Sequence, residues 1–300
     1  MYYNKLSDNL VVIRDDIYPL LGGGNKARKM HYIGRYIIAN QHDAIVTTGG
    51  IQSNHCRAVA VFAARNKIKC TLVLHGSKSK FYNGCGNSKI IRLSGAECVF
   101  VDNPSQIAET MDSEMKRYTK NGYSPYYLWG GGHTMDGGLA FIEAAEQILT
   151  ELNDINWSPE YIFLASGTGS TQSGIMAGLD KLKNHNTQVI GISVGRKKKY
   201  ATEVIELFYK ELCKYYKIEC SNRPTIVLDE YLFGGYGMFN NELMDLCRNS
   251  IKNYGFTLDT CYTGKAFYGM LDYIKHNNLK NSNILFWHTG GVFNFLAEDF

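Results

Sequence analysis

The sequence lacks the features that mark several common classes of protein. Its longest apolar run, residues 58–64, is about seven residues, far below the roughly 18 needed to cross a bilayer. The eight cysteines are scattered without a CxxC pair, and no two histidines have HxxxH spacing, so we expect no metal centre. The opening residues MYYNKLSDNL contain no apolar signal region, so we expect a cytoplasmic protein with reduced thiols.

Strong charge of either sign is also missing. The 32 Lys and Arg residues against 28 Asp and Glu residues give a net charge of +4, too small to require a nucleic acid or an anionic membrane as partner. The basic run Arg196–Lys199 has no interleaved aromatic residues and is interpreted as a solvated helix start. No GxSxG or GxxxxGK[ST] motif occurs, which argues against an α/β-hydrolase and a P-loop nucleoside triphosphatase.

Short apolar, β-branched runs alternate with helical patterns, an order typical of βαβ units and a parallel sheet. The predicted fold class is therefore α/β, and 300 residues favour two domains or one large one. The pattern predicts strands over residues 10–13, 44–47, 69–74, 98–101, 161–164, 189–194 and 284–287. It predicts helices over residues 27–39, 55–64, 88–93 and 105–120, and another that ends at residue 151.

The 30 glycines, against only five prolines, cluster in a few loops. Several of these loops follow predicted strands, and open parallel sheets bind ligands at the carboxyl ends of their strands. In Ser166–Thr171, converging backbone N–H groups, hydroxyls and a helix N-terminus would form a phosphate cradle. A plain Gly/Ser turn is the alternative. Gly22–Ala27 matches the dinucleotide pattern GxGxxA only loosely, and because no good strand precedes it we reject that interpretation.

Two further loops carry residues that could react or bind. Lys26 lies beside three glycines at a predicted helix start, where the positive helix end would lower its pKa and favour the neutral amine that forms a Schiff base. Taken alone, that loop favours a solvated surface lysine. Ile51–His55 places consecutive polar residues before an apolar helix. One of them could serve as the N-cap, and anion binding by the helix N-terminus is the other open interpretation.

Seven blocks in one order resemble a known family. They are Val12–Asp16, Gly23–Lys29, Gly49–His55, Gly167–Thr171, Gly235–Gly237, Leu258–Lys265 and Leu285–Gly291. Together they resemble the pyridoxal-phosphate (PLP) enzymes D-cysteine desulfhydrase and 1-aminocyclopropane-1-carboxylate (ACC) deaminase. The resemblance implies the tryptophan synthase β-like fold, with two open parallel-sheet domains and the cofactor between them. It implies a large domain of residues 1–28 and 138–300, and a small domain of residues 29–137.

The resemblance also implies a role for each matching residue near the predicted helix starts. Lys26 would hold pyridoxal 5′-phosphate covalently and later move the α-proton of the substrate. Asn54 would donate a hydrogen bond to the phenolic oxygen of the cofactor. Ser53, with the backbone N–H groups of Asn54 and His55, would receive the substrate carboxylate.

The later blocks would complete the site. The resemblance assigns the 5′-phosphate to Gly167, Thr168, Gly169, Ser170 and Thr171. Tyr236 and Tyr262 would flank the substrate as catalytic residues. Thr263 and Thr289 would lie beside the pyridine nitrogen, where ACC deaminases carry Glu and Leu instead. Glutamate keeps that nitrogen protonated, whereas threonine supplies only a neutral hydrogen bond, so the threonine pair favours desulfhydrase-like chemistry.

The function that follows from the resemblance is that of a PLP-dependent lyase. It would act by α,β-elimination on a small amino acid such as D-cysteine, giving pyruvate, ammonia and sulfide, as a cytoplasmic homodimer. ACC deamination, elimination from another β-substituted amino acid, β-replacement, and a PLP-retaining binding or regulatory protein stay open. The chain departs from the family pattern at residues 129–133 and 292–295, and the latter segment lacks the customary proline.

Overall fold

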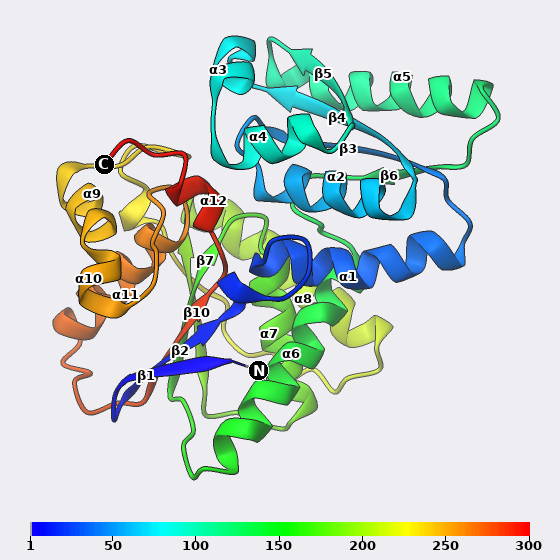
Figure 1. Ribbon diagram of the computed structural model, residues 1–300. Helices are drawn as coiled ribbons and strands as arrows, with labels where there is room; N and C mark the ends of the chain where they lie inside the picture. The colour runs from blue at the N-terminus through cyan, green and yellow to red at the C-terminus, as the bar shows by residue number, and fades with distance from the viewer. Residues whose placement is uncertain (1) are drawn as a thin grey trace.

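The strands of the computed structural model, which describes residues 2–300, form two sheets (Figure 1). They are β1 (Tyr3–Ser7), β2 (Leu10–Arg14), β3 (Ala44–Gly50), β4 (Lys69–His75), β5 (Glu97–Val101), β6 (Pro125–Leu128), β7 (Tyr161–Ser166), β8 (Gln188–Ser193), β9 (Ile226–Leu228) and β10 (Ile284–His288). The larger sheet has the order β1-β2-β10-β7-β8-β9 and the smaller one β5-β4-β3-β6. All neighbouring strands are parallel except β1, which pairs antiparallel with β2.

Helices cover both sheets. They are α1 (Gly24–Ala39), α2 (Asn54–Asn66), α3 (Lys78–Asn83), α4 (Gly86–Leu93), α5 (Ile107–Lys120), α6 (Met135–Asn153), α7 (Ser170–Lys181), α8 (Lys198–Tyr215), α9 (Asn241–Arg248), α10 (Ser250–Tyr254), α11 (Thr263–His276) and α12 (Val292–Phe295), with short 3₁₀ turns η1 (Asp15–Ile17), η2 (Pro104–Gln106) and η3 (Glu230–Leu232). The prediction of an α/β fold with two parallel-sheet domains is confirmed, and the antiparallel edge strand β1 was not foreseen.

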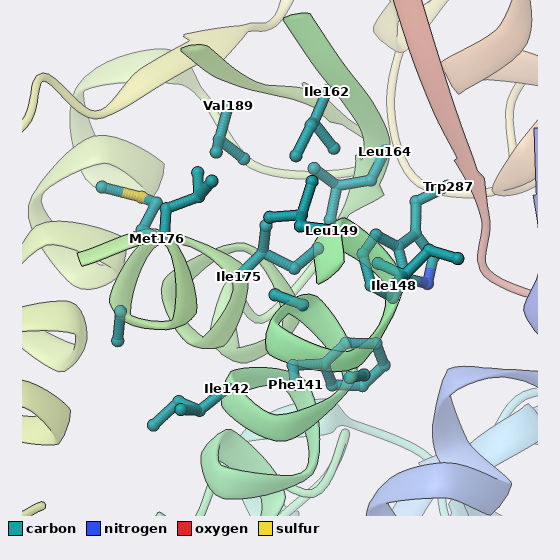
Figure 2. Close-up of a cluster of buried hydrophobic side chains, with 14 of the residues drawn as sticks. Phe141, Ile142, Ile148, Leu149, Ile162, Leu164, Ile175, Met176, Val189 and Trp287 are labelled. Atoms are coloured by element: carbon teal, nitrogen blue, oxygen red, sulfur yellow. The ribbon is translucent and has the colours of Figure 1, made fainter. Parts of the chain in front are cut away.

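The larger sheet is buried on both faces. On one face, aliphatic residues of α6 and α7 pack against inward side chains of β7, β8 and β10, including the fully buried Trp287 (Figure 2). On the other face, Phe267 and Met270 of α11 pack against Phe163 and Phe286. Burial on both faces explains why these strands read as nearly continuous apolar runs. It also holds the loops at their carboxyl ends in fixed positions.

The chain order places distant loops together. β10 lies between β2 and β7, with Ile284 opposite both Leu10 and Tyr161 in parallel register. The loops that follow β2, β10, β7 and β8 therefore emerge at the same edge of the larger sheet. In the smaller sheet, the loops after β3, β4 and β6 emerge at one edge in the same way.

The predicted domain boundaries fall inside two helices. The boundary at residues 28 and 29 lies within α1, and the boundary at residues 137 and 138 lies within α6. Met30, Ile33 and Ile37 of α1 join the core of the smaller sheet. The division of the chain at these residues stays a prediction. Over residues 2–300, no helix combines the length and the apolar character that a membrane crossing requires.

Candidate active site

A cavity of about 400 Å³ lies between the carboxyl edges of the two sheets. The smaller sheet contributes Thr48–Gly50, His75 and Trp129–Gly131 to its wall, and the larger sheet contributes the loops that follow β7, β8 and β10. The cavity brings together nine residues that sequence predicted for the site. They are Lys26, Ser53, Asn54, His55, Gly167, Thr168, Tyr236, Tyr262 and Thr289.

Lys26 is brought into the cavity by the glycine turn at the start of α1. Gly22, Gly23 and Gly24 all have positive φ angles, which glycine adopts without strain. A Cβ at Gly23 would lie 2.0 Å from the Asp16 carbonyl oxygen, so no other residue fits there. The Lys26 Nζ atom lies 3.3 Å from the Gly131 carbonyl oxygen. Burial lowers the pKa of Lys26 to about 8, so a useful fraction of the amine is neutral near pH 7.

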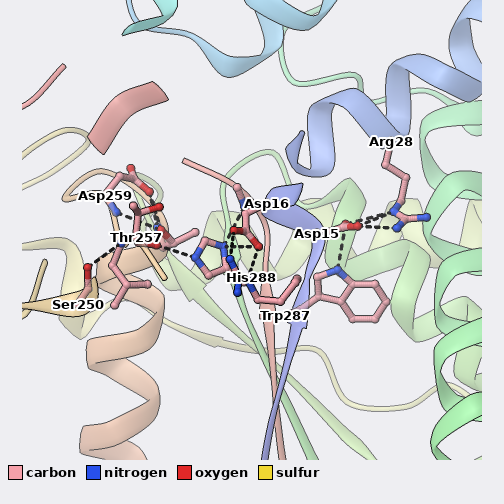
Figure 3. Close-up of polar contacts among 12 residues, drawn as sticks. Asp15, Asp16, Arg28, Ser250, Thr257, Asp259, Trp287 and His288 are labelled. Atoms are coloured by element: carbon pink, nitrogen blue, oxygen red, sulfur yellow. Dashed lines mark hydrogen bonds and ion pairs between the residues drawn. The ribbon is translucent and has the colours of Figure 1, made fainter. Parts of the chain in front are cut away.

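A buried ion pair holds α1 against the larger sheet (Figure 3). The Arg28 guanidinium donates to Asp15 from Nε at 2.9 Å and from Nη2 at 2.5 Å. The Trp287 indole N–H donates to the other oxygen of Asp15 at 3.1 Å. Asp15 and Arg28 are both buried. This network fixes the helix that carries Lys26 to the ends of β2 and β10.

The N-terminus of α2 forms the opposite wall. Ser53 is the N-cap, and its Oγ accepts a hydrogen bond from the Cys56 backbone N–H at 3.2 Å. The first N–H groups of a helix have no intrahelical acceptor, so those of Asn54 and His55 are available to an anion at the positive helix end. The prediction of a carboxylate site at this loop therefore has matching geometry, and the roles of its residues stay predictions.

The His55 ring is neutral and has one defined tautomer. The Thr47 hydroxyl donates its only proton to the Leu128 carbonyl oxygen at 2.6 Å. It must therefore accept from His55 Nε2, 2.8 Å away, which places the ring proton on Nε2. Burial, followed by the nearby charges of Lys26 and Lys29, lowers the pKa of His55 to about 3. His55 therefore adds no charge to the anion site near neutral pH.

The loop after β7 forms a cradle at the N-terminus of α7. Gly169 has φ +93°, and a Cβ there would lie 2.4 Å from Ile205 Cγ1. Gly167 and Thr168 line the cavity, whereas Gly169, Ser170 and Thr171 lie behind them at the start of the helix. The Thr171 hydroxyl accepts from Asn25 Nδ2 at 3.1 Å. The loop thus offers backbone N–H donors to the cavity. The hydroxyls of Ser170 and Thr171 are bonded to Lys29 and Asn25 instead.

Lys29 lies behind this cradle and is absent from the residues that line the cavity, and sequence reasoning missed its contact with the loop. Its Nζ lies 2.7 Å from Ser170 Oγ and 3.5 Å from the Gly131 carbonyl oxygen. Both acceptors are neutral. Lys29 is only 1% exposed, and a lysine buried to this extent usually has an acidic partner. A buried amine that faces only neutral acceptors at a helix N-terminus fits a phosphate group, whose negative charge would favour its ammonium form. The signal was present, because Lys29 lies three positions after Lys26 and therefore on the same side of the helix.

The position of Arg196 differs from the prediction for the basic run Arg196–Lys199. The run Arg196–Lys199 was expected to be a solvated helix start, and α8 does begin at Lys198. Arg196, however, lies before the helix, lines the cavity, and donates from Nη1 to the Thr168 carbonyl oxygen at 3.3 Å. It thereby places a fixed positive charge beside the cradle.

Two tyrosines stand side by side at the mouth of the cavity. The hydroxyls of Tyr236 and Tyr262 are hydrogen-bonded to each other, and their rings meet edge to face with centroids 5.9 Å apart. Burial is the largest cause that raises the pKa of both phenols above the ordinary value. Both therefore stay protonated near neutral pH and can donate a hydrogen bond. The buried Lys265 Nζ holds the Tyr236 loop by donating to the Leu232 and Gly235 carbonyl oxygens at 2.8 and 2.7 Å.

The two predicted ring-nitrogen contacts lie in different environments. Thr289 lines the cavity. Thr263 is fully buried and is absent from the residues that line the cavity. Its hydroxyl donates to the Asp259 carboxylate at 2.7 Å. The structure therefore brings Thr289 to the site and places Thr263 behind it, and the roles of both stay predictions.

One group of possible metal ligands occurs within residues 2–300, away from the cavity. Ligand atoms of Asp180, Cys213 and Cys220 lie within 4.8 Å of one another. The Asp180 oxygens already accept hydrogen bonds from Tyr209, Ser221 and Arg223. This carboxylate is therefore engaged by protein donors, and the prediction that the protein holds no metal stays a prediction.

Comparison with known proteins agrees with this geometry. Residues 3–290 match the family model described as pyridoxal-phosphate dependent enzyme. A D-cysteine desulfhydrase of Klebsiella pneumoniae is 31% identical over 97% of this chain and 90% of its own length. A putative ACC deaminase of Pyrococcus horikoshii is 30% identical over 96% of this chain and 86% of its own length. The solved structure of an ACC deaminase homologue superimposes with a TM-score of 0.86 at 29% identity, covering 95% of this chain and 85% of that one.

Proposed function

Because this chain belongs to the family of pyridoxal-phosphate-dependent enzymes, we propose that it is a lyase that catalyses α,β-elimination on a small β-substituted amino acid, with D-cysteine as its substrate. The products would be pyruvate, ammonia and sulfide. One observation carries the proposal. Lys26, the N-terminus of α2 and the loop before α7 all border one cavity of about 400 Å³, so an amine and the backbone N–H groups of two loops are available to one bound ligand.

The residues of the cavity fit pyridoxal 5′-phosphate. The cradle before α7 and the ammonium group of Lys29 would hold the phosphate, and Lys26 would hold the aldehyde carbon covalently. Asn54 lines the same cavity, and its side-chain amide would donate to the phenolic oxygen. When bound, PLP supplies a ring that accepts the electron pair left at the α-carbon. The remaining work of binding, orientation and proton transfer belongs to the protein.

The substrate would be oriented through its carboxylate. The N–H groups at the start of α2 and the Ser53 hydroxyl would bind that group, and the neutral His55 avoids trapping it in a salt bridge. Lys26, whose pKa is lowered to about 8, is the base that would remove the α-proton. Tyr236 and Tyr262 share one hydrogen bond, so one of the two hydroxyls keeps its proton free and would donate it to the leaving group. A thiolate leaves with little assistance, which suits a single neutral donor.

The acid–base character of the cavity favours elimination over ring opening. Among residues 2–300, those that line the cavity include no Asp or Glu, so no carboxylate is placed to keep the pyridine nitrogen protonated. Thr289, which lines the cavity, would offer a neutral hydroxyl to that nitrogen. Opening a cyclopropane that has no α-hydrogen needs a stronger electron sink than expelling thiolate does. A cavity lined by neutral hydroxyls therefore supports the desulfhydrase reaction over ACC deamination.

The test is a substrate panel with the PLP-loaded protein. D-cysteine, L-cysteine, ACC and cysteate are compared by kcat/KM, scored for pyruvate or 2-oxobutyrate and for sulfide or sulfite. We expect D-cysteine to give the highest value and Lys26→Ala to abolish both turnover and the visible absorbance of the cofactor. A preference for ACC would replace this proposal with a deaminase. Retained colour and turnover in Lys26→Ala would overturn the assignment of Lys26.

Assembly and location form a separate part of the proposal. The family resemblance supports a homodimer, and light scattering of the purified full chain would test it. The eight unpaired cysteines support a cytoplasmic enzyme, and the net charge of +4 supports one that needs neither nucleic acid nor an anionic membrane. Fractionation of the source cells tests the location. A monomer in light scattering would remove the dimer from the proposal without affecting the chemistry.

A further inference from the structure

The segment that departs from the family pattern joins the two domains. Residues 292–295 form the short helix α12, which lies against α4 of the smaller domain (Figure 1). Asn294 in this helix is only 7% exposed. Its Nδ2 donates to the Gln52 carbonyl oxygen at 3.1 Å, and its Oδ1 accepts from Asn54 Nδ2 at 2.6 Å. A residue close to the C-terminus therefore touches the loop and helix start that carry the predicted carboxylate site.

A third amide closes the cluster. Asn87 is fully buried, and its Nδ2 lies 3.0 Å from Asn54 Oδ1, 3.2 Å from Asn294 Oδ1 and 3.1 Å from the Gln52 carbonyl oxygen. Two hydrogens thus serve three acceptors, so at least one bond is shared. We call Asn54, Asn87 and Asn294 the amide cluster.

The amide cluster defines which way the Asn54 side chain points. The oxygen of Asn54 accepts from Asn87, and one hydrogen of its Nδ2 is donated to Asn294. Rotating the amide by 180° would set its NH₂ group against the NH₂ group of Asn87 and its oxygen against the oxygen of Asn294. Both contacts would then be repulsive. The second Nδ2 hydrogen of Asn54 is free to be donated to a ligand, and Asn54 is one of the residues that line the cavity.

We propose that Asn294 is a positioning residue that, together with Asn87, fixes the Asn54 amide so that an N–H group rather than the oxygen faces the phenolic oxygen of PLP. The inference rests on the proposed function for the identity of the ligand. It extends that function to a residue outside the seven blocks of family resemblance. It also explains a polar side chain buried in the segment where the customary proline is missing.

The first experiment measures the amide itself in the full chain without cofactor. Hydrogen exchange of the Asn54 side-chain NH₂ is followed by ¹⁵N NMR, with Asn54→Ser assigning the signal. Asn294→Leu removes all three hydrogen bonds of this side chain, including the one that Asn54 donates. It should accelerate this exchange by about tenfold or more, because a hydrogen-bonded N–H exchanges slowly. Asn294→Asp keeps the acceptor oxygen and should preserve most of the protection. Unchanged exchange in Asn294→Leu would overturn the proposal.

The second experiment uses the PLP-loaded protein and separates positioning from general loosening. Losing a donor to the phenolic oxygen should raise the pH midpoint of the visible absorbance titration by about half to one pH unit in Asn294→Leu. The matched control is Phe293→Leu, one position before Asn294 in α12. The Phe293 ring packs against the Arg57 guanidinium, whose Cζ lies 4.8 Å from the ring centroid. This control should leave the midpoint in place. An equal shift in both variants would reduce Asn294 to a structural role and overturn the proposal.

Failure of the proposed function gives a different result. If the wild-type protein shows no visible absorbance with PLP, the proposed function is wrong and the cofactor part of this inference falls with it. The exchange rates in the cofactor-free chain still decide whether Asn294 orients Asn54. If the wild type has the absorbance and only the Asn294 predictions fail, the lyase proposal stands and this inference alone is overturned.

Discussion

Lys29 Nζ lies 2.7 Å from Ser170 Oγ, although 141 positions separate the two residues. The contact joins the first helix of the chain to the N-terminus of α7. Burial is the main cause that lowers the pKa of Lys29 well below its ordinary value, and the charge of Lys26 adds to it. An anion bound at the cradle would reverse this effect, because an opposite charge favours the ammonium form.

Replacement of Lys29 should weaken binding of the cofactor phosphate specifically. A charge-assisted hydrogen bond contributes about 1.5–3 kcal/mol, so we expect Lys29→Met to raise the Kd for PLP by about 10- to 100-fold. The affinity for pyridoxal, which has no phosphate, should change little. Fluorescence titration with both compounds measures the ratio. The control is Lys181→Met at the exposed end of α7, the helix whose start Lys29 contacts. Equal losses for PLP and pyridoxal in Lys29→Met would contradict the assignment.

The rate of covalent PLP attachment should follow the neutral form of Lys26. With a pKa lowered to about 8 by burial, the amine gains its neutral form as pH rises. The rate at a fixed low PLP concentration should therefore increase about tenfold per pH unit below pH 8 and level off above it. Stopped-flow absorbance between pH 6 and 9.5 measures it. A rate that keeps rising to pH 9.5 would show an ordinary lysine pKa and contradict the role of burial.

Much of this site could be predicted because its residues lie next to one another in sequence. Ser53, Asn54 and His55 follow one strand together, and Gly167–Thr171 follow another. A short sequence pattern was therefore enough to identify each group. The sheet class followed from buried strands such as Ile284–His288, whose five residues are all buried. By contrast, Lys29, Arg196 and Asn294 act on partners more than 25 positions away, and only the folded chain brings them together.

Other misses have a local cause. The strand Ile226–Leu228 has three residues and Pro125–Leu128 has four, too few for an alternating pattern to be distinguished from a loop. The edge strand Tyr3–Ser7 reads as polar because it is only half-buried. Thr263 shows a different limit, because the residue was identified in sequence but the direction of its side chain was not. The family resemblance assigns it to the ring nitrogen, and that role stays a prediction. Its hydroxyl donates to Asp259, a direction that a match in sequence does not state.

Breaking the ion pair between Asp15 and Arg28 should destabilise the fold strongly. The Asp15 carboxylate accepts from Arg28 and from Trp287, and both members of the ion pair are buried. We expect Asp15→Asn to lower the free energy of unfolding by about 3–5 kcal/mol. The double variant with Arg28→Met should regain more than half of this loss, because it also removes the buried charge. Urea denaturation measures both values.

An exposed pair provides the scale for that experiment. Glu206 and Lys210 form an i,i+4 pair on α8 with roughly half-exposed side chains. Glu206→Gln should therefore cost less than about 1 kcal/mol. If Asp15→Asn cost no more than Glu206→Gln, the network in Figure 3 would not be what holds α1 against the sheet.

Lys265 should act on catalysis through the Tyr236 loop. Its buried Nζ bonds the Leu232 and Gly235 carbonyl oxygens, and the loop around Tyr236 contains three glycines with positive φ angles. Without this anchor, the hydroxyl pair of Tyr236 and Tyr262 would no longer be held at the cavity. We expect Lys265→Met to reduce kcat/KM for the best substrate by about tenfold or more, while Lys275→Met, on the exposed face of the same helix, has little effect.

A double-mutant cycle distinguishes this role from a loss of stability. If Lys265 acts by holding Tyr236, its replacement should cost little further activity once Tyr236→Phe has removed the hydroxyl, since effects through a shared partner are not additive. If Lys265→Met instead costs the same factor in the presence and in the absence of that hydroxyl, the two residues act independently. Independent effects on log kcat/KM add, so this result would assign Lys265 to the packing of α11 rather than to the tyrosine pair.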